Sequence, residues 1–124
     1  MATEQGVDQG QGGAVGRLTD LVLDCADPER LAAFWGSLLG VGVADRTDSF
    51  VELERLPNGL GLGLQKVPEP KVGKVRLHID ITAPDQDAAA ERVIALGGRH
   101  VEDIETWRVM TDPEGHEFCL LREK

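Results

Sequence analysis

The 124-residue sequence contains only two cysteines, Cys25 and Cys119, and they form no CxxC pair. This spacing indicates neither a zinc knuckle nor a disulfide framework, so we expect two free thiols. The sequence also lacks a GxSxG elbow, an HExxH pair and a glycine-rich phosphate loop. Serine hydrolysis, zinc proteolysis and nucleotide binding therefore have no support from motifs.

Basic residues are scarce. There are 13 Lys and Arg against 22 Asp and Glu, which gives a formal net charge of -9. Such a chain repels a phosphate backbone, and no basic stripe interleaved with aromatics offsets the repulsion, so we expect no nucleic-acid partner. An acidic surface mildly favours cationic small molecules, but it equally serves ordinary solubility. The charge therefore does not choose a ligand.

Long apolar runs are absent, and the N-terminus does not show the basic-then-apolar order of a signal peptide. We therefore expect a cytoplasmic protein with no membrane partner. Residues 1–16 are rich in Gly and Gln and have no apolar period, which predicts a disordered tail. The remaining residues, 17–124, are enough for one domain with a single core.

The first half of this domain reads as a strand, a helix and three short strands. "RLTDLVLDCAD" predicts the strand, and "DPERLAAFWGSLLG" predicts the helix, with Asp27 as N-cap, Pro28 in the first turn and Gly40 at the exit. The apolar stripe of this helix is Leu31, Phe34, Trp35, Leu38 and Leu39. The three strands are expected at 41–45, 49–55 and 60–67, with "PNG" as a tight turn.

The same order then restarts. The segment "VPEPKVGK" predicts a linker at about 68–74, which separates a module at about 17–67 from one at about 75–122. The second module has an expected strand at 75–82, a helix at 85–96 and strands at 99–103, 107–111 and 117–122. A shift of 58 positions pairs identical residues at the helix cap, stripe and exit, including Asp27 with Asp85 and Gly40 with Gly98. We therefore predict an α+β fold of two βαβββ modules.

The strand at 75–82 places a polar row opposite an apolar one. Arg76, His78 and Asp80 alternate with apolar residues, at steps of about 7 Å along one face. The row either grips a small molecule or lies in solvent. On the strand at 60–67, Gly61 and Gly63 leave one face without side chains, which either admits a ligand or only permits twist.

The order and spacing of four motifs resemble those of a known superfamily. "DPERLAAFW", "VPEPKVGKVRLHIDI", "ALGG" and "DPEGHEFCLL", spread over residues 17–122, are similar to the glyoxalase-like, bleomycin-resistance-like branch of the vicinal oxygen chelate superfamily. The resemblance implies a cup-shaped sheet that holds a small organic molecule, often in a homodimer. Its metal-dependent members are lyases, isomerases, epimerases and ring-cleaving dioxygenases, and its metal-free members sequester drugs.

In the metal-dependent members the ligands lie on the first and last strands of each module. The resemblance maps these places to Asp20, Gln65, His78 and Cys119. Only His78 matches the family pattern well, because the last strand of the second module carries the thiol of Cys119 where the family usually has a carboxylate ligand. A thiolate suits zinc more than the harder ions of the family, and the apolar run "FCLL" raises the pKa of a thiol. We therefore expect no tightly held metal, with a divalent ion as the open alternative.

The leading hypothesis is a glyoxalase-like protein that binds a small organic molecule between paired curved sheets. His78 is the predicted general acid or base, with Asp20 or Asp80 to orient it and Arg76 to hold an anionic group. The predicted substrate-binding residues are Asp20, Gln65, Arg76, Asp80, Trp107 and Cys119.

Two other functions stay open: a metal-dependent lyase or isomerase of the glyoxalase type, and a drug-sequestering resistance protein. His116 is read as a turn residue and His100 as a surface residue. The sequence leaves open whether the modules pair within one chain or across a dimer.

Overall fold

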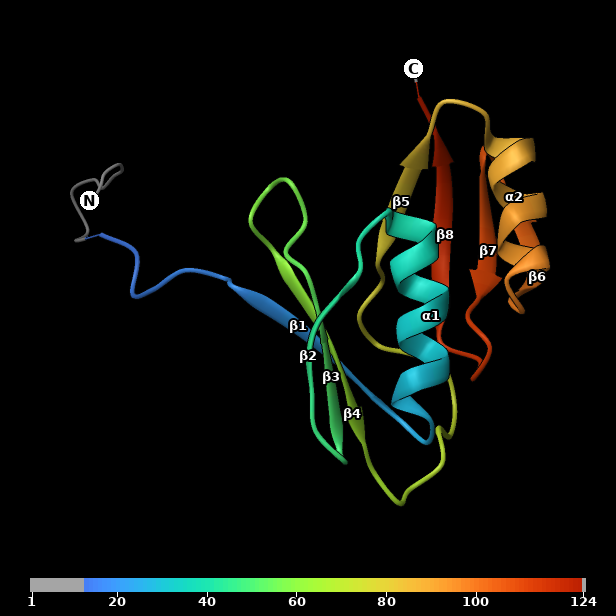
Figure 1. The fold of residues 1–124 in the computed structure, drawn as a ribbon. Helices are drawn as coiled ribbons and strands as arrows, with labels where there is room; N and C mark the ends of the chain where they lie inside the picture. The colour runs from blue at the N-terminus through green and yellow to red at the C-terminus, as the bar shows by residue number, and fades with distance from the viewer. Residues whose placement is uncertain (1–12, 124) are drawn as a thin grey trace.

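Two four-stranded sheets, each with one helix, form the computed structural model, which describes residues 13–123 (Figure 1). The first module contains β1 (Asp20–Cys25), α1 (Pro28–Leu39), β2 (Val43–Arg46), β3 (Phe50–Leu53) and β4 (Gly61–Lys66). The second contains β5 (Asp80–Ala83), α2 (Gln86–Ala95), β6 (Arg99–Ile104), β7 (Trp107–Thr111) and β8 (Glu117–Arg122). This order confirms the predicted fold class. Most of the predicted tail, residues 1–12, lies outside the described residues.

Both sheets have the same topology. The strand orders are β1-β4-β3-β2 and β5-β8-β7-β6, and in each sheet the first and last strands of the module are parallel neighbours. A helix links the first strand of each module to the antiparallel strands that follow. Neither helix in the described residues has the length and apolar character needed to span a bilayer.

Both helices begin with the same N-cap. The Asp27 side chain accepts a hydrogen bond from the Arg30 amide at 3.2 Å, and the Asp85 side chain accepts one from the Ala88 amide at 3.0 Å. Helix α1 ends at Gly40 in the left-handed region, with φ of 75°. The repeat therefore shares the N-cap but not the C-cap, because α2 is capped by Leu96 with φ of -86° and the positive φ of 103° falls on Gly97.

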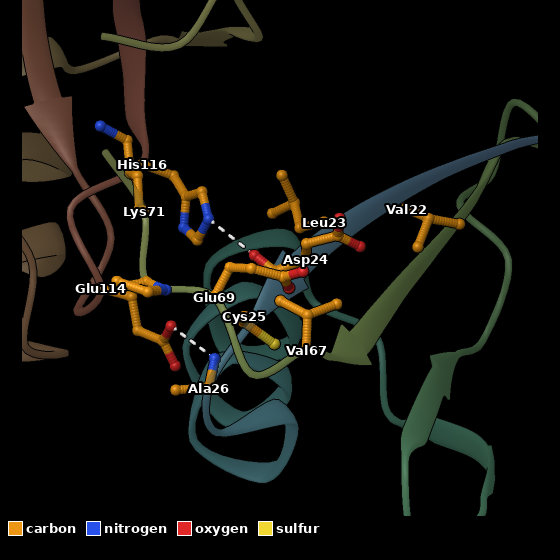
Figure 2. Close-up of a pocket in the computed structure, with 11 residues that line it drawn as sticks. Val22, Leu23, Asp24, Cys25, Ala26, Val67, Glu69, Lys71, Glu114 and His116 are labelled. Atoms are coloured by element: carbon orange, nitrogen blue, oxygen red, sulfur yellow. Dashed lines mark hydrogen bonds between the residues drawn. The ribbon is translucent and has the colours of Figure 1, made fainter. Parts of the chain in front are cut away.

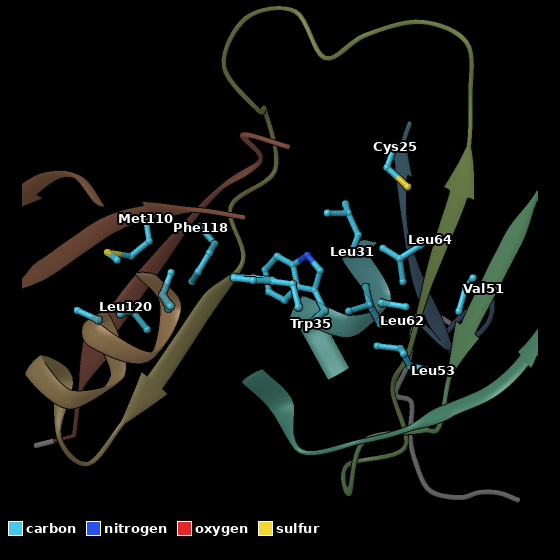
Figure 3. Close-up of a cluster of buried hydrophobic side chains, with 14 residues drawn as sticks. Cys25, Leu31, Trp35, Val51, Leu53, Leu62, Leu64, Met110, Phe118 and Leu120 are labelled. Carbon is cyan, nitrogen blue, oxygen red and sulfur yellow. The ribbon is translucent and has the colours of Figure 1, made fainter. Parts of the chain in front are cut away.

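One hydrophobic core joins the two modules. Helix α1 packs on the first sheet, and its Trp35 ring also lies 5.0 Å from the Phe118 ring on β8, centroid to centroid (Figure 3). Phe34 makes an edge-on contact with each of these two rings. The most buried members of this core are Leu31, Phe34, Trp35, Val51, Leu53, Leu64, Val93, Met110, Phe118 and Leu120.

The predicted strand at 75–82 is shorter in the structure. β5 begins at Asp80, residues 67–79 form no strand, and Leu77 is 69% exposed. The carboxylate of Glu117 explains the difference, because its Oε1 accepts a hydrogen bond from the Val75 amide at 3.2 Å and lies 3.1 Å from Lys71 Nζ. The contacts with the Glu117 side chain thus fix residues 71–75 in place of the backbone hydrogen bonds that a longer β5 would make.

Truncation of the central aromatic cluster should be costly. We expect Phe118→Ala to lower the free energy of unfolding by about 3–5 kcal/mol, because it removes a buried ring that both modules contact. Ile94→Ala, at a 53% exposed position on α2, should change it by less than about 1 kcal/mol. Urea unfolding followed by circular dichroism measures both, and equal losses would contradict a shared core.

Candidate functional site

Each sheet has one face covered by its helix and one that we call its helix-free face. On the second sheet, Asp80 and Val109 flank Cys119 across neighbouring strands, and all three side chains lie opposite the core side chains of those strands. His78, just before β5, lines two adjoining cavities on this face, and Trp107 and Cys119 line both of them too. One, of about 260 Å³, is lined by His78, Asp80, Trp107, Cys119 and Leu121.

The second cavity, of about 180 Å³, has a mixed lining. It shares His78, Trp107 and Cys119 with the first cavity. Its other lining residues are the apolar Ile104, Val109 and Phe118 and the charged Lys74, Glu102 and Glu117. An indole and aliphatic groups beside a few charges suit a small molecule with an apolar body and a polar end.

Glu117 holds the segment that carries His78. Although burial raises the pKa of its carboxyl, the backbone amides of Val75 and Glu117 and the Lys71 ammonium together lower that pKa below its usual range. The carboxylate therefore stays charged at neutral pH. Sequence reasoning did not identify Glu117, because its partners lie more than 40 positions away and the contact has no local signal.

The Cys119 thiol is a weak nucleophile and a weak metal ligand. Burial raises its pKa and so does the nearby Asp80 carboxylate, while Lys74 lowers it by less. The thiol is therefore protonated at neutral pH. Both cysteines are free, as expected from their spacing.

The two site residues predicted from the first module do not converge. Asp20 lies opposite Gly61 in the sheet, and its carboxylate is 3.1 Å from the Arg55 guanidinium, whereas Gln65 lies opposite Asp24. Four residues along one strand separate the two positions by about 13 Å. Neither residue lines the cavities at His78. Arg76 lies exposed in the irregular segment and does not line them either.

The glycine face of β4 is covered. A Cβ at Gly63 would overlap the Phe50 ring, and one at Gly61 would overlap the Asp20 carboxylate. The glycines therefore make room for Phe50 and for the pair between Asp20 and Arg55, so the alternative of a bare floor for a ligand is wrong.

The donors that the resemblance suggested do not fit a metal centre. Val22 lies 58 positions before Asp80 and pairs with Gly63, just as Asp80 pairs with Cys119, so Gly63 is the counterpart of Cys119 and offers no donor. Across residues 13–123, no group of three or more His, Cys, Asp or Glu side chains is arranged to hold an ion.

A third cavity, of about 430 Å³, lies at the junction of the modules (Figure 2). It is bounded by the end of β1, the connecting segment and the turn 112–116, and its charged lining residues are Asp24, Glu69, Lys71, Glu114 and His116. Burial, with smaller contributions from nearby carboxylates, raises the pKa of Cys25 in its wall to about 12. His116 lies in the turn as predicted, and it is also buried against β1.

Thiol reactivity tests the protonated state of Cys119. In a Cys25→Ser background, we expect an aromatic disulfide reagent to modify Cys119 at pH 7 more slowly than it modifies a free cysteine peptide, because less thiolate is present. Asp80→Asn should speed the reaction, since it removes a negative charge that opposes ionisation. A rate equal to that of the peptide, unchanged by Asp80→Asn, would contradict this assignment.

Comparisons with known proteins agree with this architecture. A crystal structure from Burkholderia phytofirmans, described as a glyoxalase/bleomycin resistance protein/dioxygenase family enzyme, has 14% identity and a TM-score of 0.72, over 86% of this chain and 98% of that one. A glyoxalase-related enzyme from Fulvimarina pelagi has 17% identity and a TM-score of 0.69, over 88% and 89%. The trypanothione-dependent glyoxalase I of Leishmania major has 21% identity and a TM-score of 0.70, over 87% of each chain.

At these identities the solved structures establish the fold alone. No curated protein matches the sequence. The family model described as the glyoxalase-like domain matches residues 20–121, which cover both modules. The chain therefore belongs to the glyoxalase-like domain family.

Proposed function

We propose that this protein binds a small organic molecule on the helix-free face of its second module. The observation that carries the proposal is the convergence of His78, Trp107 and Cys119 on two adjoining cavities. The Trp107 ring would contact an apolar part of the ligand, while Lys74 or Glu102 would meet its polar end.

The chemistry that this site can supply is proton transfer at His78. Of the three side chains that line both cavities, His78 is the candidate general acid or base, because the Cys119 thiol is held protonated and the Trp107 indole only donates a hydrogen bond. The Asp80 carboxylate lines the same cavity and would orient the imidazole. Arg76, two residues before His78 but outside both cavities, would hold an anionic group of a ligand that extends beyond them.

A second copy of the chain would complete the site. The cavities at His78 contain no residue of the first module, and α1 with the shared core occupies the space between the two sheets of one chain (Figure 1). The helix-free face of the first module, with Asp20, Phe50 and Gln65, is thus free to cover the same face of a partner's second module. Members of the superfamily often form dimers.

A ligand screen tests the binding proposal. We expect some members of a panel of small metabolites and antibiotics to raise the melting temperature, because a ligand that binds only the native state stabilises it. His78→Ala should abolish the shift, while His100→Ala, at an exposed histidine on β6, should keep it. Neither variant should lower the melting temperature of the free protein by more than a few degrees. A shift that persists in His78→Ala would overturn the proposed site.

Oligomeric state tests the arrangement of the two copies. Val22→Glu places a charge on the helix-free face of the first sheet, at a residue that is 47% exposed. Ile94→Glu is the control, because it places the same charge on helix α2, away from that face, at a residue that is 53% exposed. In sedimentation equilibrium we expect Val22→Glu to dissociate the dimer and Ile94→Glu to leave it intact. Dissociation by Ile94→Glu alone would place the interface elsewhere.

A further inference from the structure

The turn 112–116 of the second module is built around one buried carboxylate. Asp112, whose side chain is fully buried, accepts hydrogen bonds from Trp35 Nε1 at 3.0 Å and from His116 Nδ1 at 2.8 Å. The backbone amides of Glu114 and His116 donate to it as well, at 2.9 and 3.0 Å. The carboxylate thus connects this turn to α1 of the first module.

The other ring nitrogen of His116 faces a second acceptor. Nε2 lies 3.0 Å from the carbonyl oxygen of Asp24 on β1, as the dashed line in Figure 2 shows. A carbonyl oxygen and a carboxylate oxygen can only accept hydrogen bonds, so both ring nitrogens must carry hydrogen for both contacts to form. The geometry therefore requires the imidazolium form of His116.

The groups around His116 favour this positive charge. The turn that contains His116 contributes two carboxylates, those of Asp112 and Glu114. Strand β1 contributes the carbonyl of Asp24 and the neutral thiol of Cys25. The connecting segment places Glu69 and Lys71 on the other side of the cavity. The Lys71 ammonium is paired with Glu117. The hydrogen bond to Asp112 raises the pKa of His116 most, burial opposes it, and the charge of Asp112 and the Asp24 carbonyl add to the increase.

We propose that His116 is a pH-sensitive latch that fastens the second module to the first. The imidazolium closes the latch, since it bridges the buried carboxylate of one module and the backbone of the other. Loss of the proton removes one of the two bonds and leaves an acceptor without a donor. The latch then opens at the junction of the modules, while the aromatic core around Trp35 and Phe118 stays packed.

A second contact between the turn and the first module shows which backbone amides would be released if the latch opened. The Glu114 carboxylate accepts hydrogen bonds from the amides of Ala26 at 2.8 Å and Asp27 at 2.7 Å, directly before α1. These amides stay bound only while the turn lies against β1. Their protection from hydrogen exchange should therefore report whether the latch is closed.

The direction of the pH effect follows from the raised pKa. A group whose pKa is higher in the folded state stabilises that state fully below its unfolded value, about 6.5 for histidine, and the benefit is lost as the pH rises through the folded value. Within that window a single proton changes the folding equilibrium constant by up to about tenfold per pH unit. An upper limit of pH 8.5 keeps the cysteines out of the titration.

The test compares urea unfolding from pH 5.5 to 8.5 in three proteins. His116→Gln keeps a polar side chain but cannot carry the charge. His100→Gln is the matched control, because His100 also lies 2.8 Å from an aspartate, Asp103, but in an exposed pair. We expect the wild type and His100→Gln to lose stability together as the pH rises, and the profile of His116→Gln to be flatter. The same slope in all three proteins would overturn the latch.

A second measurement on the wild type does not depend on the folding of a variant. Nitrogen-15 NMR of the histidine rings at pH 6 should show both nitrogens of His116 protonated, and its signals should report the pH at which this ring loses its proton. Exchange at Ala26 and Asp27, corrected for intrinsic base catalysis, should quicken as His116 loses its proton. A His116 ring with one protonated nitrogen at pH 6, or exchange that does not follow its titration, would refute the proposal.

Discussion

The buried carboxylate of Asp112 is the group on which the relation between the two modules depends. A buried charge is costly unless its hydrogen bonds are complete, and here the indole of Trp35 on α1 supplies one of the four donors. If the modules packed in another orientation, this carboxylate would lose that donor. The aromatic contact between Trp35 and Phe118 brings the modules together by apolar burial, whereas the polar contact selects one orientation.

Much of this fold could be predicted because its signals are local and occur twice. Asp27 and Asp85 cap their helices as read from the sequence, and β7 and β8 have the predicted bounds. The strand around His78 was predicted too long. The alternation of polar and apolar residues there predicted one strand face with Arg76, His78 and Asp80, but it carries no information about the carboxylate of Glu117, which accepts a hydrogen bond from the backbone amide of Val75.

Of the predicted site residues, only some of those in the second module lie together in the structure. His78, Trp107 and Cys119 lie together because β5, β7 and β8 are neighbours in the sheet. The match between Gln65 and Cys119 is wrong, because the shift between equivalent positions is not constant. It is 58 at the helix caps Asp27 and Asp85, 57 between β3 and β7, where Glu52 and Val109 are equivalent, and 56 between β4 and β8, where Gly63 and Cys119 are equivalent. Gln65 therefore corresponds to Leu121. A difference in loop length is hard to place in a sequence where so few positions repeat.

The stretch 67–79 joins two units that each have a finished sheet and a helix, and it forms no strand of its own. Its role in assembly is thus mainly that of a tether, which raises the effective concentration of one half near the other. A chain cut within this stretch would yield two fragments with complementary aromatic and ionic surfaces. Fission here would turn an intramolecular fit into a bimolecular one, and the strength of reassociation would measure how much the interface contributes without the covalent connection.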